Sequence, residues 1–257
     1  LPADERSGRA VVFEGPDEGA PARFSRIDVR GDRIALHDLD AGRLEIDPKR
    51  PGDTADHLTL RGVSARSLYA GAVNDLEIHG GHWGPQDDLP VIQIGSASRV
   101  LLDGLDVHDA RASGPEVHTE CIWAASVDGF VLRDSRLRGC SYFGLFLTRL
   151  TGPDPRDVTL ERNVFEPTRT YAGVPAPYVV NVANWVRRLE GLTLSGNTFA
   201  GAVALQPETI RGGRITGNAG TEAVCHPALA AGRNVWAAGR CGPTDRVDPR
   251  LRRTLLT

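Results

Sequence analysis

The chain of 257 residues carries 30 basic and 33 acidic side chains, which give a formal net charge of −3. The two signs are interspersed, and this excludes a basic face for nucleic acid and a polybasic run for a membrane surface. No apolar run approaches the roughly 18 residues that span a bilayer. The length suits one large all-β domain, and 29 glycines with 17 prolines suit a chain rich in turns. We therefore expect a single domain over residues 1–257, in a monomer.

The N-terminal segment, residues 1–55, is charged and irregular in its pattern. Ile34, Leu36, Leu44 and Ile46 alternate with other residues and predict early short strands. We expect this segment to form the first coils and a cap. The chain opens at Leu1 without a methionine, a charged n-region or an apolar h-region, and we interpret it as a processed, mature chain.

Residues 56–215 contain an internal repeat. Short segments with apolar residues at alternating positions recur, and each is followed by a polar turn of Gly, Asn or Asp. The last apolar residues of these segments lie at positions 60, 78, 102, 132, 160, 194 and 215. Alternation with a period of two predicts strands with one buried face. The spacing of roughly 25 residues is typical of one strand-and-turn coil per repeat.

A second strand in each coil can be aligned by counting back from these positions. Its apolar residues are Ile92, Ile122, Leu145, Val180 and Val203. If these residues stack inward, the residue that follows each of the first four points outward. These outward residues form a row of Gln93, Trp123, Phe146 and Asn181. This pattern predicts an all-β parallel β-helix, a solenoid in which each coil contacts its neighbours. The rule for parallel crossovers makes the helix right-handed.

The last segment, residues 216–257, loses the repeat, and we expect it to be a C-terminal cap and tail. It contains two of the four cysteines. The even count fits disulfides Cys121–Cys140 and Cys225–Cys241, although three connectivities are formally possible and free buried thiols are the alternative. No CxxC pair is present, which argues against a zinc ribbon or a redox motif. Disulfides predict a secreted, extracellular protein.

The strands with asparagine turns resemble the repeats of the pectate-lyase-like superfamily of secreted right-handed β-helix proteins. Residues 118–122 (His-Thr-Glu-Cys-Ile), the later Cys140 and the stretch from Asn234 to Gly242 resemble an actinobacterial-type group of such proteins. The resemblance covers roughly residues 56–245. It implies an extracellular polysaccharide as partner, and the superfamily includes uronate lyases, glycoside hydrolases, epimerases and non-catalytic modules. Fold does not fix which of these applies.

A pair of carboxylates is the first candidate site. Glu120 lies at the start of a second strand, and Asp88 lies near the same place in the preceding coil, opposite His118. A diagonal pair of this kind has a backbone separation of about 7–8 Å. Inverting glycosidases hold their two carboxyl groups about 6.5–9.5 Å apart. The pair faintly resembles the aspartates of polygalacturonases, but their Gly-His-Gly and Arg-x-Lys motifs have no clear counterpart here.

Elimination from a uronate polysaccharide needs other groups, and a lyase is the activity we place first. Asp87, Asp88 and Glu120 offer hard oxygen ligands for a possible Ca²⁺. His118 or Tyr142 is the expected proton shuttle, and Arg149 the clamp on the sugar acid. The arginine-centred motif of typical pectate lyases is not evident.

The third hypothesis is glycan binding without catalysis. The outward row of Gln93, Trp123, Phe146 and Asn181 offers a surface on which a sugar ring stacks, and His82 lies in a neighbouring loop.

Each of these residues also has an ordinary structural explanation. His118 can form a hydrogen bond with a backbone group of a turn, and Glu120 can accept hydrogen bonds from turn N–H groups. Asp87 and Asp88 can form Asx turns. Trp123 can pack beneath a loop. The convergence of Glu120, Asp88 and His118 in one groove is the observation that separates a catalytic site from these alternatives.

Overall fold

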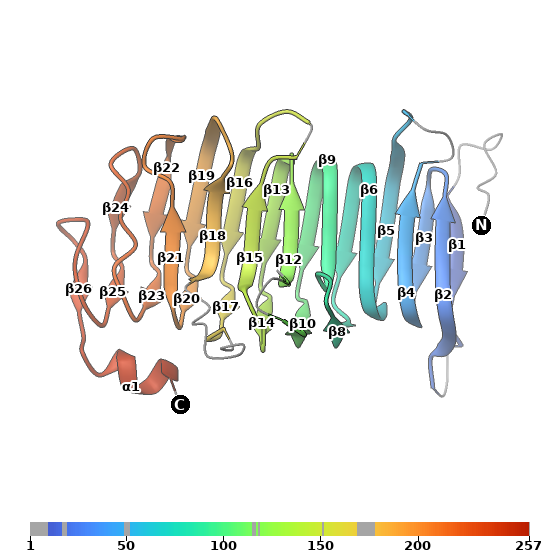
Figure 1. Cartoon of the computed structure of the whole chain (residues 1–257), viewed down its shortest axis with the longest axis horizontal. Coiled ribbons are helices and arrows are strands. Elements are labelled where there is room, and N and C mark those ends of the chain that lie inside the picture. Colours follow the sequence, from blue (N-terminus) through green and yellow to red (C-terminus); the bar gives the residue numbers. More distant parts are fainter. Residues whose placement is uncertain are drawn as a thin grey trace.

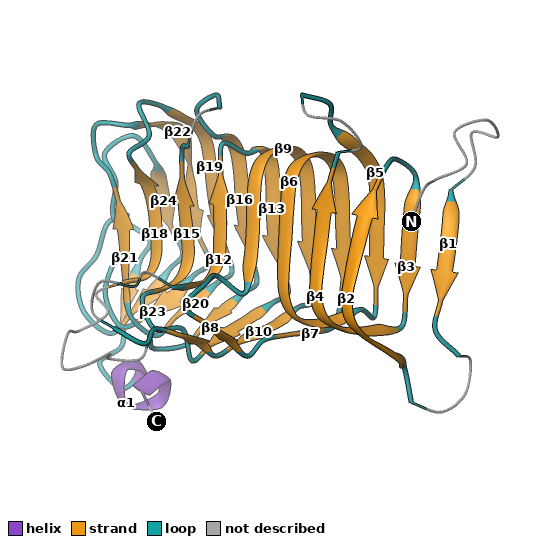
Figure 2. Cartoon of the chain, turned by 45° about the vertical axis from the view of Figure 1, so that its right-hand side comes forward, coloured by secondary structure: helices purple, strands orange, loops and turns teal. Residues whose placement is uncertain are grey.

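The computed structural model describes residues 10–16, 20–48, 52–114, 117, 119–150, 152–168 and 178–256. Parallel strands stack coil upon coil into a right-handed β-helix, as the repeat predicts, with the two chain ends at opposite ends of the stack (Figures 1 and 2). His118 lies outside the described residues.

Three parallel sheets, here called sheets A, B and C, form the faces of the helix. Sheet A contains β2 (Ala22–Arg30), β4 (Leu39–Asp47), the first parts of β6 (Ser64–His79) and β9 (Ile92–Asp103), β12 (Glu120–Ala125), β15 (Phe143–Thr148), β18 (Tyr178–Asn184) and β21 (Ala202–Leu205). Sheet B contains β1 (Val11–Glu14), β3 (Ile34–His37), β5 (Ala55–Arg61), the last parts of β6 and β9, β13 (Asp128–Arg133), β16 (Arg156–Glu161), β19 (Leu189–Ser195), β22 (Ile210–Thr216) and β24 (Ala230–Gly232).

Sheet C is made of shorter strands. They are β7 (His82–Trp83), β10 (Asp106–His108), β14 (Arg136–Arg138), β17 (Val164–Phe165), β20 (Thr198–Phe199), β23 (Ala219–Gly220), β25 (Val235–Trp236) and β26 (Arg246–Val247). A separate pair, β8 (Gln86–Asp87) and β11 (Ala110–Arg111), lies in the connection from sheet C to sheet A. The one described helix, α1 (Leu251–Leu256), follows the last strand, and it is too short to cross a membrane.

The seven apolar positions that mark the repeat form a single column in the core. Residues 60, 78, 102, 132, 160, 194 and 215 pair in register from β5 to β22. All are buried, with Leu160 at 0% exposure. Burial of one such side chain stabilises a fold by roughly 1.5–3 kcal/mol, so the column is a main source of stability.

A ladder of asparagine side chains crosses the turns between sheets B and C. Asn163, Asn197, Asn218 and Asn234 are each at most 1% exposed. The Oδ1 of each later asparagine accepts a hydrogen bond from the backbone N–H of the one before, at 2.8–3.0 Å. The residue before each asparagine has a positive φ of 53–67°, which explains the glycines at 196 and 217. The ladder satisfies backbone groups that the corner of the helix buries.

Asp245 ends the ladder with a carboxylate. Its Oδ1 accepts from the backbone N–H of Asn234 at 3.1 Å, and its Oδ2 accepts from the indole of Trp236 and the backbone N–H groups of Cys241 and Gly242. Burial acts to raise the pKa of Asp245, but the hydrogen bonds from Gly242, Asn234 and Cys241 outweigh it and lower the pKa to about 2.

The regular architecture extends beyond the range that the repeat indicates. At the N-terminal end, β2 and β4 are nine residues each and pair in register, so the early strands are longer than expected. At the C-terminal end, sheet C and the ladder continue to Asp245 and β26. The short strands there contain Ala219 and Gly220, which give no apolar alternation in the sequence.

Both expected disulfides are present, Cys121–Cys140 and Cys225–Cys241. The first links the start of β12 to the residue before the turn into β15, and both of its sulfurs are buried. It therefore holds the strand that begins with Glu120.

Candidate functional site

A pocket of about 320 Å³ opens on sheet A, where the connection after β8 passes the starts of β9 and β12. Eight residues line this sheet A pocket: Asp88, Leu89, Pro90, Gln93, Glu120, Trp123, Phe146 and Trp185. Five of them are residues that the sequence singles out: Asp88, Gln93, Glu120, Trp123 and Phe146.

The outward row on sheet A has the register that the sequence predicts. Gln93 pairs with Trp123, Trp123 with Phe146, and Phe146 with Asn181. Their neighbours Ile92, Ile122, Leu145 and Val180 are fully buried in the core. Alternation along each strand therefore sends every second side chain to the outer face of the sheet, and parallel pairing stacks those side chains in line.

Glu120 is the first residue of β12 and is only 3% exposed. Burial disfavours its charged form and raises the pKa of its carboxyl to about 7, against a smaller lowering by a hydrogen bond from its own backbone. Among the described residues, no cation forms an ion pair that would offset the burial. A carboxyl with a pKa near 7 can donate or accept a proton at neutral pH.

Asp88 reaches the same pocket from the preceding coil and is exposed. Its Oδ1 accepts a hydrogen bond from the backbone N–H of Ser113 at 2.6 Å, and its own N–H donates to the carbonyl of Arg111 at 2.8 Å. Its φ of 59° turns the chain sharply at this point. The pocket therefore contains two carboxyl groups in different surroundings, one buried and one open to solvent.

Aromatic rings form another part of the pocket surface, beside Leu89, Pro90 and Gln93. The rings of Trp123 and Phe146 are stacked at 6.5 Å between centroids, and Phe143 lies 5.1 Å from Phe146. Trp185 stands edge-on to Phe146 at 6.1 Å, with an interplanar angle of 75°. Its side chain is 71% exposed. Such rings are suited to the apolar C–H face of a sugar.

The sequence predictions missed Trp185. It follows β18, where the register with β15 shifts by one residue between Leu147 and Thr148. The sequence signal that existed was a tryptophan just after a predicted strand of the outward row. The shift itself has no such signal, because a bulge is a property of the paired backbone.

Five of the predicted residues that the structure describes do not line the sheet A pocket. Tyr142 packs edge-on against Phe143 at 5.2 Å, outside the lining. Asn181 continues the outward row and is buried, and its Oδ1 has no hydrogen-bond partner among the residues that the structure describes. His82 lies in sheet C with its Nδ1 3.3 Å from the Oδ2 of Asp106, and Asp87 is exposed in β8.

Arg149 also lies outside the lining. Its Nε donates to the carbonyl of Gly152 at 3.1 Å, and its Nη1 lies 3.8 Å from the Oδ1 of Asp154. The guanidinium is therefore engaged within its own loop.

The structure does not bring Asp87, Asp88 and Glu120, the expected calcium ligands, together in one cluster. Within the described ranges, no group of three His, Cys, Asp or Glu side chains is arranged to hold a metal ion. The physical reason is that Glu120 is buried and lines the pocket, whereas Asp87 is exposed in β8 and is not among the lining residues.

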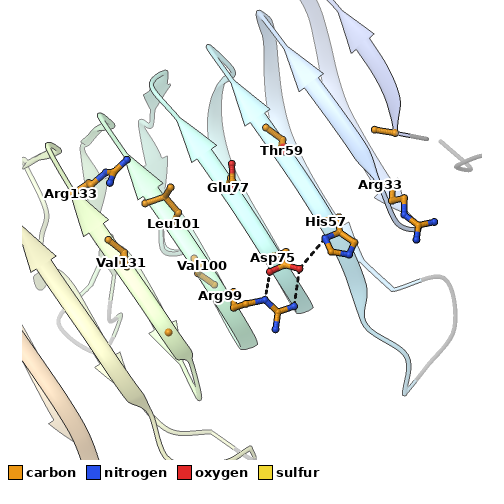
Figure 3. Close-up of a pocket in the computed structure, with 12 residues that line it drawn as sticks. Arg33, His57, Thr59, Asp75, Glu77, Arg99, Val100, Leu101, Val131 and Arg133 are labelled. Atoms are coloured by element: carbon orange, nitrogen blue, oxygen red, sulfur yellow. Dashed lines mark hydrogen bonds and ion pairs between the residues drawn. The ribbon is translucent and has the colours of Figure 1, made fainter. Parts of the chain in front are cut away.

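A larger pocket, about 850 Å³, lies on sheet B, where the sequence predicts no site. Figure 3 shows Asp75 of this pocket joined to both Arg99 and His57. Asp75 bonds Arg99, with Oδ2 2.8 Å from Nη2, and also lies 2.9 Å from Nδ1 of His57. The hydrogen bond from Arg99 lowers the pKa of Asp75. Its carboxylate is therefore held in the ionised form.

Neither a family model nor a curated protein matches the chain. Among solved structures, it is similar to the Dettilon tailspike protein (gp208), with 12% identity and a TM-score of 0.44. The match covers 94% of this chain and 60% of the tailspike chain, so the chain spans less than two thirds of that protein. We draw nothing about function from a likeness of this size.

Proposed function

We propose that this β-helix acts on a glycan, with the sheet A pocket binding a sugar ring and Glu120 transferring the proton at the scissile bond. The observation that carries the proposal is the buried Glu120 carboxyl, with a pKa of about 7, in a pocket walled by Trp123, Phe146 and Trp185. A raised carboxyl pKa is what a general acid in glycoside hydrolysis needs at neutral pH.

The reaction that the two carboxyl groups support best is hydrolysis with inversion. Glu120 gives its proton to the glycosidic oxygen as the bond from that oxygen to the anomeric carbon breaks. Asp88 takes a proton from a water molecule, whose oxygen bonds the anomeric carbon from the other side. Solvent then carries the proton from Asp88 back to Glu120. The different surroundings of the two groups support this division into acid and base.

Elimination from a uronate, the activity placed first from the sequence, has less support. It needs a cation that neutralises the sugar carboxylate, and the described lining of the pocket contains no Arg, Lys or His. Arg149 is engaged by Gly152 and Asp154. The two disulfides support an extracellular location, where polysaccharides are found.

The test is a panel of neutral and uronate polysaccharides, assayed for new reducing ends and for unsaturated products. We expect reducing ends without unsaturation, and loss of turnover in Glu120→Gln and Asp88→Asn. Glu190→Gln, an exposed carboxyl on sheet B, is the matched control and keeps full turnover. Unsaturated uronide products would show that the reaction is an elimination and not a hydrolysis. Turnover that survives in Glu120→Gln would remove Glu120 from the mechanism.

A further inference from the structure

Trp185 has an unusual backbone conformation for a large side chain. Its φ is 60°, in the left-handed region that favours glycine. It directly follows the shifted register of β18 against β15, so the chain both gains a residue and turns at this point. Bulges next to functional sites redirect side chains, and strained residues persist where the rest of the structure enforces them.

The side chain of Trp185 gains little from the fold in return. At 71% exposure it is the most exposed large hydrophobic side chain in the described part of the molecule. Among the described residues, its ring contacts that of Phe146 edge-on, at 6.1 Å. A core or packing role does not account for a strained, exposed indole. Its place in the pocket wall accounts for it, because an exposed ring beside the buried ring of Phe146 offers a face to a ligand.

The charges of the pocket restrict that ligand. The titratable groups in the described lining are Glu120 and Asp88, both acidic, and Gln93 is the neutral polar group. A uronate carboxylate bound here would meet the carboxylate of Asp88, and the described lining offers no cation to offset their repulsion. An uncharged sugar can donate hydrogen bonds from its hydroxyl groups to the oxygen atoms of Asp88, Glu120 and Gln93, and its C–H face can stack on the rings.

We propose that Trp185 is the residue on which an uncharged sugar stacks, above Trp123 and Phe146, and that the pocket selects neutral over acidic glycans. This inference rests on the proposed function and adds the substrate class and the residue that positions it.

The experiment measures binding by calorimetry to the Glu120→Gln protein, so that turnover does not consume the ligand. The probes are neutral oligosaccharides of glucose, xylose, galactose and mannose, with galacturonate and mannuronate oligomers as the acidic set. We expect a neutral oligomer to bind, no acidic oligomer to bind as tightly, and Trp185→Ala to weaken binding about tenfold, as the loss of one stacked ring predicts.

Trp185→Gly separates a ligand-binding role from a structural one. Glycine adopts the positive φ without strain, so we expect this variant to lose binding and to keep or raise its Tm. A structural role predicts a lower Tm instead. Phe24→Ala, an exposed aromatic on β2, is the control and leaves binding unchanged.

The outcomes separate the two proposals. This inference is overturned if acidic oligomers bind tightly, or if Trp185→Ala binds neutral oligomers as tightly as the parent protein does. The proposed function still stands in that case if Glu120→Gln abolishes turnover of the natural glycan. A panel without binding and without turnover in the native protein overturns both.

Discussion

Asp88 and Glu120 reach one pocket from consecutive coils, yet Asp88 is exposed whereas Glu120 is 3% exposed. Their pairing follows from the solenoid, because equivalent positions in neighbouring coils lie one strand apart. Their difference follows from the place of Glu120 at the start of β12, beside Phe143 of the next coil. One carboxyl is therefore buried and the other remains in solvent.

The first prediction concerns stability and pH. The pKa of Glu120 rises from 4.5 in the unfolded chain to about 7 in the folded one. The contribution of Glu120 to the free energy of unfolding is therefore fully present below about pH 4.5 and is lost as the pH rises through 7. The change amounts to about 3 kcal/mol. Glu120→Gln removes this pH-dependent loss of stability, because the amide side chain does not titrate. We expect denaturant unfolding at pH 8 to show a variant more stable than the native protein, with the difference vanishing near pH 4. An equal difference at both pH values would show that Glu120 is not buried as described.

Asp245 gives the opposite dependence. Its pKa is lowered from 3.8 to about 2, so its contribution is present above about pH 4 and is lost as the pH falls through 2. At pH 7 we expect Asp245→Asn to cost about 2 kcal/mol in unfolding free energy. Asp248→Asn, an exposed carboxyl three residues later, is the control and changes little. Equal effects of the two substitutions would argue against a special role for the carboxylate at the end of the ladder.

The asparagine ladder makes a third prediction. Asn197→Ala leaves the backbone N–H of Asn163 and the carbonyl of Leu160 without their buried partner. Each unsatisfied buried group costs about 1–3 kcal/mol, so we expect a loss of roughly 2–5 kcal/mol. Thermal unfolding checks this, with the exposed Gln206→Ala as the comparison. A loss below about 1 kcal/mol would mean that water replaces the amide.

Arg149 provides a prediction that separates the sequence hypothesis from the structure. The guanidinium contacts Gly152 and Asp154 in its own loop and does not line the pocket. We therefore expect Arg149→Ala to leave kcat/KM for the glycan unchanged and to lower stability by less than about 1 kcal/mol. A loss of activity on acidic substrates alone would restore Arg149 as a sugar-acid clamp and favour the lyase.

Much of this architecture follows from local pattern. Positions 60 to 215 form one column because a period of two, repeated coil by coil, leaves a single register that buries every apolar residue. The row of Gln93, Trp123, Phe146 and Asn181 follows from the same register. The disulfides agree with this register, since it brings the two cysteines of each pair close enough to bond across one coil.

The parts that the sequence did not predict depend on contacts between coils. The burial of Glu120 is set by neighbours distant in the chain, and the position of Trp185 is set by a register shift in β18. Arg149 has the chemistry of a clamp, but its loop partners decide where its guanidinium lies. Residue type can propose such roles, while only the packed coils determine which side chains share a pocket.

The pH dependence of glycan cleavage tests the role of Glu120 most directly. As the proton donor, Glu120 must be protonated, so kcat/KM on the neutral substrate is expected to fall tenfold per pH unit above about pH 7. Glu120→Gln is expected to lose turnover across the whole pH range while it still binds the oligosaccharide. A native profile that stays level from pH 6 to about pH 9, or a variant that cleaves at the native rate, would contradict the assignment of Glu120 as the catalytic acid.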